Sequence, residues 1–371
     1  MKRLSFISSS LAKNFFFYLT STLILALLFL AQSCKSPTAP KGNNPPDTTS
    51  NNFTFQTFTF GASNAGSSYL QDVTIVSDTD IWCVGAVYLD SADGAPDPNA
   101  YNAVHWNGSK WELKRIQFYT ICGQSKLTPY PAKAIYAADN NVIWIAMDGD
   151  QIVELVNGIQ TQIICLPWSF VINKIWGISS NDFYVIGNGG NIIHYQNGTW
   201  QKIESGTNMN IYDIWGASNP QTGKTEILAV ASYPDTSAQR KIIQINGTSA
   251  SEISSSGINW DLESVWFKPQ SQYFVAGTGI YDKHLLSDSI WSSQYYNVTN
   301  YYINCIRGND VNDIVAVGSF GEVIHYNGMR WKSYIDETGL TNGQYVSVAI
   351  KGNEIVAVGY NGKAVILVGR R

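Results

Sequence analysis

Residues 175–200, IWGISSNDFYVIGNGGNIIHYQNGTW, contain the clearest copy of a pattern that recurs along the chain. Short runs of β-branched and aromatic residues alternate here with Asn-Asp, Gly-Gly and Asn-Gly turn signals. An apolar anchor, Ile175, precedes Gly187 by twelve residues, and His194 precedes Trp200 by six. The stretch therefore predicts consecutive short antiparallel strands.

Both spacings recur elsewhere in the chain. The interval of twelve residues from anchor to Gly occurs again at 73–85 and 306–318, and the interval of six from His to Trp occurs at 105–111 and 325–331. Three coincident copies indicate an internal repeat, which has to be recognised before any other feature of the fold.

Weaker copies fill the intervals between these three segments. The seven anchors are Val73, Ile135, Ile175, Ile214, Val265, Ile306 and Val348. They are on average about 46 residues apart, a spacing typical of four-stranded propeller blades. No segment shows a sustained helical period. The sequence therefore predicts an all-β protein, a seven-bladed β-propeller of four-stranded blades.

The last repeat is one strand short. It ends at Arg371 after only three predicted strands, whereas residues 53–60, FTFQTFTF, form an alternating strand without a blade. Pairing this strand into the last blade would close the ring and protect both edges. We therefore expect the propeller to span 53–371.

Composition excludes several classes of protein. The chain has 371 residues, of which 14% are charged and 44% hydrophobic, and its net charge is −4. The absence of a basic block argues against nucleic-acid binding. The apolar content is too high for a disordered chain.

The N-terminus predicts export. Lys2 and Arg3 precede the uncharged stretch 15–30, which at sixteen residues is short for a membrane span of roughly 20. Residues 1–33 are expected to be a signal peptide. The Ala-Gln-Ser-Cys sequence ending at Cys34 resembles the lipobox of bacterial lipoproteins, which implies acylation of that Cys. An ordinary signal peptide with an incidental Cys is the alternative.

A tether is expected to follow. Residues 34–52 are polar and Pro-rich, without periodicity. Position 35 is Lys rather than the Asp that resembles an inner-membrane retention signal. The favoured location is therefore the outer membrane, with attachment through the lipid anchor alone. Whether the protein faces the periplasm or the outside stays open.

The repeat also resembles known families. The segment 187–190 followed by Tyr195 and Trp200 resembles Kelch-type propellers. The Trp-Gly and Asn-Asp opening is similar to propeller lipoproteins of the Bacteroidetes–Chlorobi group. This resemblance covers about 53–371 and implies a fold and a cell-envelope location, but no particular activity. The chain lacks the Gly-His and Trp-Asp dipeptides of WD repeats.

Polar residues that recur at the same position of several repeats are interpreted as structural. Three histidines share one repeat position: His105, His194 and His325. Glu154 and Gln244 occupy the same slot, so it needs only a hydrogen-bonding group. Three aspartates open the second strand: Asp80, Asp182 and Asp313. We expect these to bond the amides of their own turns, and we predict no metal site and no cofactor.

The cysteines divide into two kinds. Cys83 and Cys305 lie in apolar strands and are expected to be buried thiols. Cys122 and Cys165 could form a disulfide in an oxidising envelope. Sequence alone does not fix this pairing.

Insertions indicate where binding occurs. Five long connections fall on the face shared by the strand-two-to-three and blade-to-blade loops: 86–102, 119–131, 232–240, 294–304 and 334–344. Tyr rings can stack while their hydroxyls bond, which suits a protein or glycan ligand. The candidate binding residues are Tyr88, Asp90, Asp93, Tyr101, Tyr130, Tyr233, Tyr296 and Tyr301.

Three functions remain open. The favoured one is a lipid-anchored binding or scaffold protein without catalysis, because the sequence contains no nucleophile elbow, CxxC or phosphate-binding loop. The first alternative is a glycosidase or lyase that uses loop carboxylates. The second is a structural subunit of an envelope or secretion assembly.

Overall fold

The computed structural model describes residues 48–62, 66–139, 141–233, 239–294 and 298–371. Residues 47–371 form one compact unit. Cys34, the expected signal peptide and most of the expected tether lie outside the described residues. Within the described ranges, no helix has the length and apolar character to cross a membrane.

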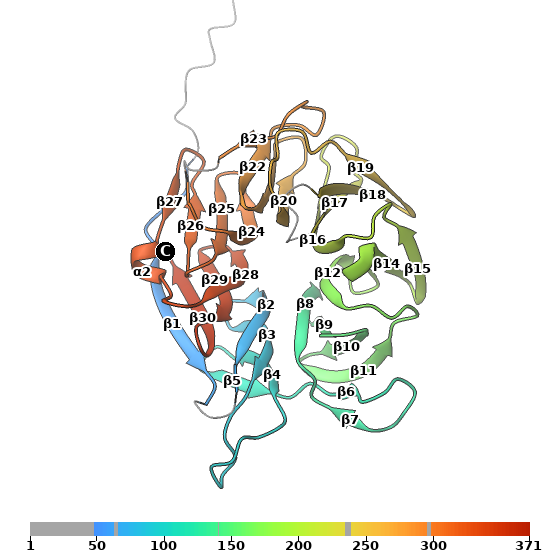
Figure 1. Ribbon diagram of the computed structural model, residues 1–371, viewed down its shortest axis with the longest axis vertical. Coiled ribbons are helices and arrows are strands. Elements are labelled where there is room, and N and C mark those ends of the chain that lie inside the picture. Colours follow the sequence, from blue (N-terminus) through green and yellow to red (C-terminus); the bar gives the residue numbers. More distant parts are fainter. Residues whose placement is uncertain (1–47, 63–65, 140, 234–238, 295–297) are drawn as a thin grey trace, which may run out of the picture. The chain divides into compact units, whose positions relative to one another are not determined.

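Seven four-stranded antiparallel sheets form a ring, which confirms the seven-bladed propeller (Figure 1). Blade 1 contains β2 (Tyr69–Ser77), β3 (Asp80–Val87), β4 (Tyr101–Trp106) and β5 (Trp111–Lys114). Blade 2 contains β8 (Ala132–Asp139), β9 (Val142–Met147), β10 (Gln151–Val156) and β11 (Ile159–Cys165). Blade 3 contains β12 (Ile172–Ser179), β13 (Asp182–Gly187), β14 (Asn191–Gln196) and β15 (Thr199–Glu204).

The remaining blades follow the same order. Blade 4 contains β16 (Asn210–Ser218), β17 (Thr225–Ser232), β18 (Arg240–Asn246) and β19 (Ser249–Ile253). Blade 5 contains β20 (Leu262–Lys268), β21 (Gln272–Gly277), β22 (Gly279–Lys283) and β23 (Ser292–Ser293). Blade 6 contains β24 (Ile303–Asp310), β25 (Asp313–Gly318), β26 (Val323–Tyr326) and β27 (Trp331–Ser333). Blade 7 contains β28 (Gln344–Lys351), β29 (Glu354–Tyr360), β30 (Ala364–Arg370) and β1 (Thr54–Phe60).

Three short elements lie outside the blades. A hairpin of β6 (Phe118–Tyr119) and β7 (Leu127–Thr128) precedes blade 2. The 3-10 turn η1 (Asn188–Gly190) lies between β13 and β14, and the single helical turn α2 (Ile335–Thr338) follows β27.

The predicted closure of the ring is confirmed. Strand β1 pairs antiparallel with β30 over seven residue pairs, from Thr54 with Arg370 to Phe60 with Ala364. The N-terminal strand thus completes the blade formed by the C-terminal strands. The ring has no unpaired seam between its first and last blades.

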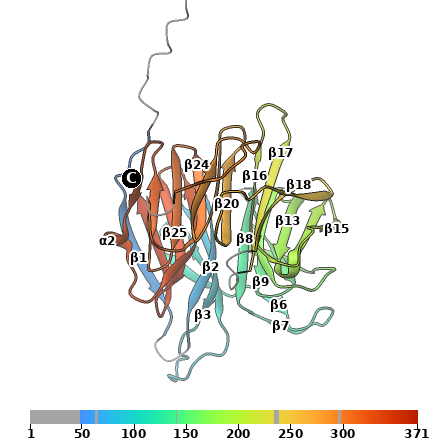
Figure 2. The same cartoon turned by 45° about the horizontal axis from the view of Figure 1, so that its top comes forward.

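The innermost strands β2, β8, β12, β16, β20, β24 and β28 surround the axis (Figure 1). We define the loop face as the end of the propeller where these seven strands begin. Because β3 runs antiparallel to β2, its last residues pair with the first residues of β2, and the β3–β4 connection lies on this face. The β6–β7 hairpin projects on the same side (Figure 2).

Adjacent blades pack through the Trp residues that directly follow the anchors of the innermost strands. The Trp176 ring of β12 lies against Gly216 of β16, where a Cβ atom would overlap the indole. The Trp215 indole N–H of the next blade donates to the Phe267 carbonyl at 3.2 Å. These rings fill the space between neighbouring blades, and the Trp of one blade packs on the Gly of the next.

The three aspartates were expected to accept hydrogen bonds from the amides of their own turns, and this prediction was wrong. In blade 3, the carboxylate of Asp182 bonds Nε2 of His194 at 2.7 Å rather than the amides of its own turn. The reason is register: His194 pairs with Tyr184, so Asp182 is its diagonal neighbour on the same face. Blades 1 and 6 repeat this contact at 2.8 Å each. The histidines are structural, as predicted.

Candidate functional site

Every innermost strand carries a β-bulge immediately before its anchor, where the register with the second strand shifts by one residue. A bulge leaves one residue unpaired and redirects its side chain. The seven bulged residues are Gln71, Lys133, Asn173, Tyr212, Glu263, Asn304 and Val346. All seven line a single cavity of about 280 Å³, which we call the cup. It lies at the loop face, because the bulges are at the start of the innermost strands.

In five of the seven blades a Gly on the second strand lies close to the bulge; blades 2 and 4 have Met147 and Ala231 at this position. Gly318, twelve residues after its anchor, pairs with Ile303 beside the bulge of blade 6. A Cβ atom at this position would overlap the carbonyl oxygen of Tyr302. The twelve-residue spacing from anchor to Gly therefore reflects the packing beside the bulges that line the cup.

A buried ion pair forms part of the cup floor. The Arg307 guanidinium donates to both carboxylate oxygens of Asp213, each at 2.8 Å. Asp213 also accepts the Ser264 hydroxyl at 2.5 Å and the Val265 amide at 3.0 Å. Burial by itself would raise the pKa of Asp213, but the charge and hydrogen bonds of Arg307 outweigh it and hold the pKa below its ordinary value. The carboxylate therefore stays ionised.

A second network completes the floor. The Lys174 ammonium donates to Asp72 at 2.6 Å, and the Ser347 hydroxyl donates to the same carboxylate at 2.7 Å. Asp72 also accepts the amide of Ile135, from the next blade, at 3.0 Å. Asp72 thus joins four blades through one carboxylate, whereas Asp213 joins three.

Residues of these two networks line two cavities. Lys174 and Arg307 line the cup and also a separate cavity of about 200 Å³, on whose wall Trp176 and Trp215 lie. The basic side chains therefore lie between the two cavities. The ion-paired groups therefore form the floor of the cup.

Two ionisable side chains on the cup wall, Lys133 and Glu263, take no part in these networks. Lys133 makes no hydrogen bond or ion pair with any described residue. Glu263 accepts one hydrogen bond, from the Tyr302 hydroxyl at 3.2 Å. Burial raises the pKa of Glu263 to about 8; the negative charges of Asp213 and Asp261 add to the rise, and the Tyr302 hydrogen bond opposes it. Glu263 is therefore largely uncharged at neutral pH.

Several residues predicted for binding also have contacts within the propeller. The Tyr101 ring lies 4.1 Å from the guanidinium carbon of Arg115. Tyr130 and Tyr233 pack against the cores of their blades. These contacts help to hold the loops against the propeller.

The other predicted residues are dispersed. The Tyr88 carbonyl accepts a backbone hydrogen bond, Asp90 is exposed, and Asp93 accepts the amide two residues on. Tyr301 is 37% exposed, and Tyr296 lies outside the described residues. None of the seven described candidates lines the cup. Their role in binding stays a prediction.

Sequence reasoning missed the cup, although a signal was present. The bulged residue is always the second residue before the anchor, and the floor residues Asp72, Lys174 and Asp213 directly precede theirs. Aligning the seven repeats on their anchors places these polar residues in two columns. An apolar strand interrupted by polar residues at a fixed offset indicates a bulge or a lined cavity.

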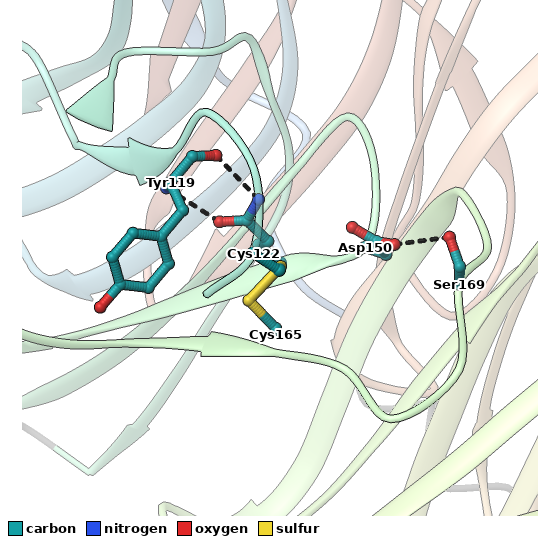
Figure 3. Close-up of a disulfide and its surroundings, with 6 residues drawn as sticks. Tyr119, Cys122, Asp150, Cys165 and Ser169 are labelled. Atoms are coloured by element: carbon teal, nitrogen blue, oxygen red, sulfur yellow. Dashed lines mark hydrogen bonds between the residues drawn. A yellow bond between two sulfur atoms is a disulfide. The ribbon is translucent and has the colours of Figure 1, made fainter. Parts of the chain in front are cut away.

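A disulfide fixes part of the loop face (Figure 3). Cys122, beside the β6–β7 hairpin, bonds Cys165 at the end of β11, with an S–S distance of 2.10 Å and a Cα–Cα distance of 6.0 Å. Tyr119 exchanges two hydrogen bonds with the Gln151 amide, each at 2.9 Å. The hairpin is thus attached to the outer edge of blade 2. The structure selects one of the pairings that the sequence left open.

Two other observations limit the chemistry of the site. Cys83 and Cys305 are buried free thiols, and burial raises the pKa of Cys83 well above its ordinary value. Among the described residues, no three His, Cys, Asp or Glu side chains lie close enough to share a metal ion.

Known proteins are similar to this chain in fold alone. No model of a known family matches the chain, and no curated protein matches its sequence. A structure of YCF48 bound to D1 peptide is similar, with a TM-score of 0.61 and 13% identity, over 90% of this chain and 99% of that one. Virginiamycin B lyase from Staphylococcus aureus is also similar, with a TM-score of 0.61 and 10% identity, over 86% of this chain and 100% of that one. A catalytically inactive His-to-Ala variant of that lyase, solved with quinupristin, is similar with a TM-score of 0.58 and 9% identity. The similarity covers 85% of this chain and 99% of that one.

Proposed function

We propose that this chain is an envelope binding protein whose loop face takes a segment of another protein into the cup. The observation that carries this proposal is the convergence of all seven bulged residues on one cavity. Six of these seven side chains are polar. Buried or half-buried polar groups on a rigid scaffold favour specific recognition, because each has to be matched by its ligand.

The similarity to YCF48 supports a polypeptide ligand. That protein was solved with a peptide bound, and a propeller of this architecture can therefore serve as a peptide receptor. The cup volume of about 280 Å³ corresponds to roughly nine water molecules at about 30 Å³ each. This space suits one side chain or one chain end rather than a folded partner.

The cup supports binding better than catalysis. The lyase variant that lost its activity lacks one histidine, whereas none of the four histidines of this chain lines the cup. A glycosidase would need two working carboxyl groups. Asp72 and Asp213 are both held in ion pairs, which leaves Glu263 alone on the wall.

We further propose that the protein is a lipoprotein anchored through Cys34, with 1–33 as the signal peptide and the outer membrane as its location. A disulfide in the structure is consistent with an oxidising compartment. Metabolic labelling with a radioactive fatty acid tests the anchor. Label should enter the wild-type chain and not Cys34→Ala; equal labelling of both would refute acylation at this residue.

Site-specific photo-crosslinking tests the binding proposal. A photoreactive amino acid replaces Val346 on the cup wall or, as a control, the exposed Thr199 on the outer strand β15. In native envelopes, the Val346 position should give a discrete protein adduct that the Thr199 position does not give. Adducts to glycan alone, or the same adducts from both positions, would contradict the proposal.

A further inference from the structure

Most charges in the cup compensate one another. The lining contains six ionisable acidic and basic groups. Asp72 pairs with Lys174, and Asp213 pairs with Arg307. These four groups are held by short hydrogen bonds between blades, so their charges are already satisfied within the protein.

Lys133 differs from Lys174 and Arg307 because it forms no ion pair with any described residue. Its backbone lies at the bulge of β8, and its side chain is half-buried on the cup wall. No described residue accepts a hydrogen bond from its ammonium group. Glu263 is the nearest acidic group on the wall; burial raises its pKa to about 8, and the charge of Lys133 opposes that rise. The cup therefore holds one ammonium group, that of Lys133, whose hydrogen bonds are free for a ligand.

We propose that the cup binds a carboxylate group of the protein segment, with Lys133 as the charged donor. This inference rests on the proposed function and names the chemistry of its ligand. A cup of this size admits one chain end or one side chain, and a carboxylate occurs at both. An ammonium donor in a partly desolvated site favours an anion strongly. Protonated Glu263 can donate a second hydrogen bond to the same group.

Three pools of fluorescent random decapeptides distinguish the two sources of carboxylate. The first pool has free C-termini and no Asp or Glu; the second is amidated and contains Asp and Glu; the third is amidated and contains neither. Binding to the full chain in detergent is measured by anisotropy. At least one of the first two pools should bind tenfold or more tightly than the third, and the pool that does identifies the source.

Matched lysine variants test the role of Lys133. Lys133→Gln should weaken binding of the preferred pool at least tenfold, the loss expected for one charged hydrogen bond. Lys126→Gln, an exposed residue of the β6–β7 connection, makes the same change in charge on the same face and should leave binding unchanged. Equal binding by Lys133→Gln and wild type would overturn the inference.

A pH series provides an independent readout. Glu263 faces Lys133 and Tyr302, with Asp213 and Asp261 also acting on it. Raising the pH from 7 to 9 ionises its carboxyl group, so wild-type binding should weaken several-fold. Glu263→Gln cannot ionise and should show a flatter profile. The same pH dependence in both proteins would contradict a carboxylate beside Glu263.

The outcomes separate this inference from the proposed function. A protein adduct at Val346 together with equal binding of all three pools would leave the proposed function standing and overturn the carboxylate. Binding of oligogalacturonate but of no peptide pool would overturn both, since the ligand would be an acidic glycan. No binding by any pool would overturn the carboxylate inference, whatever the cross-linking result.

Discussion

Asp213 and Arg307, ninety-four residues apart, form a bidentate ion pair between blades 4 and 6, with both N–O distances at 2.8 Å. Asp213 also accepts the amide of Val265 from the intervening blade 5. One buried carboxylate therefore joins three blades at the floor of the cup. Asp72 joins four blades in a similar way on the other side of the ring, so the polar groups that shape the site also tie the propeller together.

Removing one member of this pair should destabilise the fold. Arg307→Met leaves Asp213 buried without its counter-ion, and we expect the free energy of unfolding to fall by about 3–5 kcal/mol. The double variant Asp213→Asn with Arg307→Met removes both charges and should lose less than the single one. Denaturant unfolding measures all three proteins. A double variant less stable than Arg307→Met would show that the charges do not depend on each other.

Gly318 should be essential to the blade 6 bulge. Gly318→Ala places a methyl group against the Tyr302 carbonyl, and we expect a loss of about 1–3 kcal/mol from overpacking. Blade 4 has Ala231 at the corresponding paired position. The control Ala231→Gly should cost about 1 kcal/mol or less. Thermal and denaturant unfolding compare the two, and equal small losses would argue against a steric role of the Gly.

Stability should decline in acid through Asp313. Burial by itself would raise the pKa of this group, but hydrogen bonds from His325 and Arg371 prevail and lower it to about 2. Because this folded-state pKa lies below the unfolded one of about 3.9, the contribution is complete above about pH 4. It is lost as the pH falls toward 2, and it amounts to roughly 2 kcal/mol. In Asp313→Asn, the free energy of unfolding should therefore depend less on pH between pH 4 and pH 2 than it does in the wild type.

The exposed Asp90 provides the control for that measurement. Asp90→Asn should leave the acid limb of the wild-type profile in place. An Asp313→Asn profile that keeps the full wild-type slope between pH 4 and pH 2 would contradict the assignment.

The disulfide should stabilise the chain by constraining its unfolded state. Cys122 and Cys165 are separated by 43 residues, and replacing both with Ala should lower the free energy of unfolding by about 2–4 kcal/mol. Cys83→Ala, which alters a buried free thiol, leaves the cross-link intact. Reduction of wild type should reproduce the double variant, and should not affect the double variant itself.

The repeat could be predicted from the sequence because its signals are local. Anchors such as Ile175, the following Gly187 and the alternating strand at 53–60 each express strand, turn or closure preferences within a few residues. These preferences fixed the blade number and the strand that completes the ring. The Cys122–Cys165 pair was visible only as a possibility, since distance between loops depends on the folded ring.

The cup could not be predicted in the same way. Asp72 and Lys174 are 102 residues apart, and only the closed ring brings them together. A bulge also changes which side of a strand a residue faces, so simple alternation misplaces Glu263 and its counterparts. Loop tyrosines such as Tyr101 looked free in sequence because their contact with Arg115 is not local.

Filling the cup with a large side chain tests whether the ligand binds there. Val346→Trp adds an indole to the cup wall, whereas Thr199→Trp adds the same group to the exposed outer strand. Binding of the segment recovered by cross-linking is measured for both variants and for wild type. We predict at least a tenfold loss for Val346→Trp and no change for Thr199→Trp. Unchanged affinity in a folded Val346→Trp protein would place the ligand elsewhere and contradict the account.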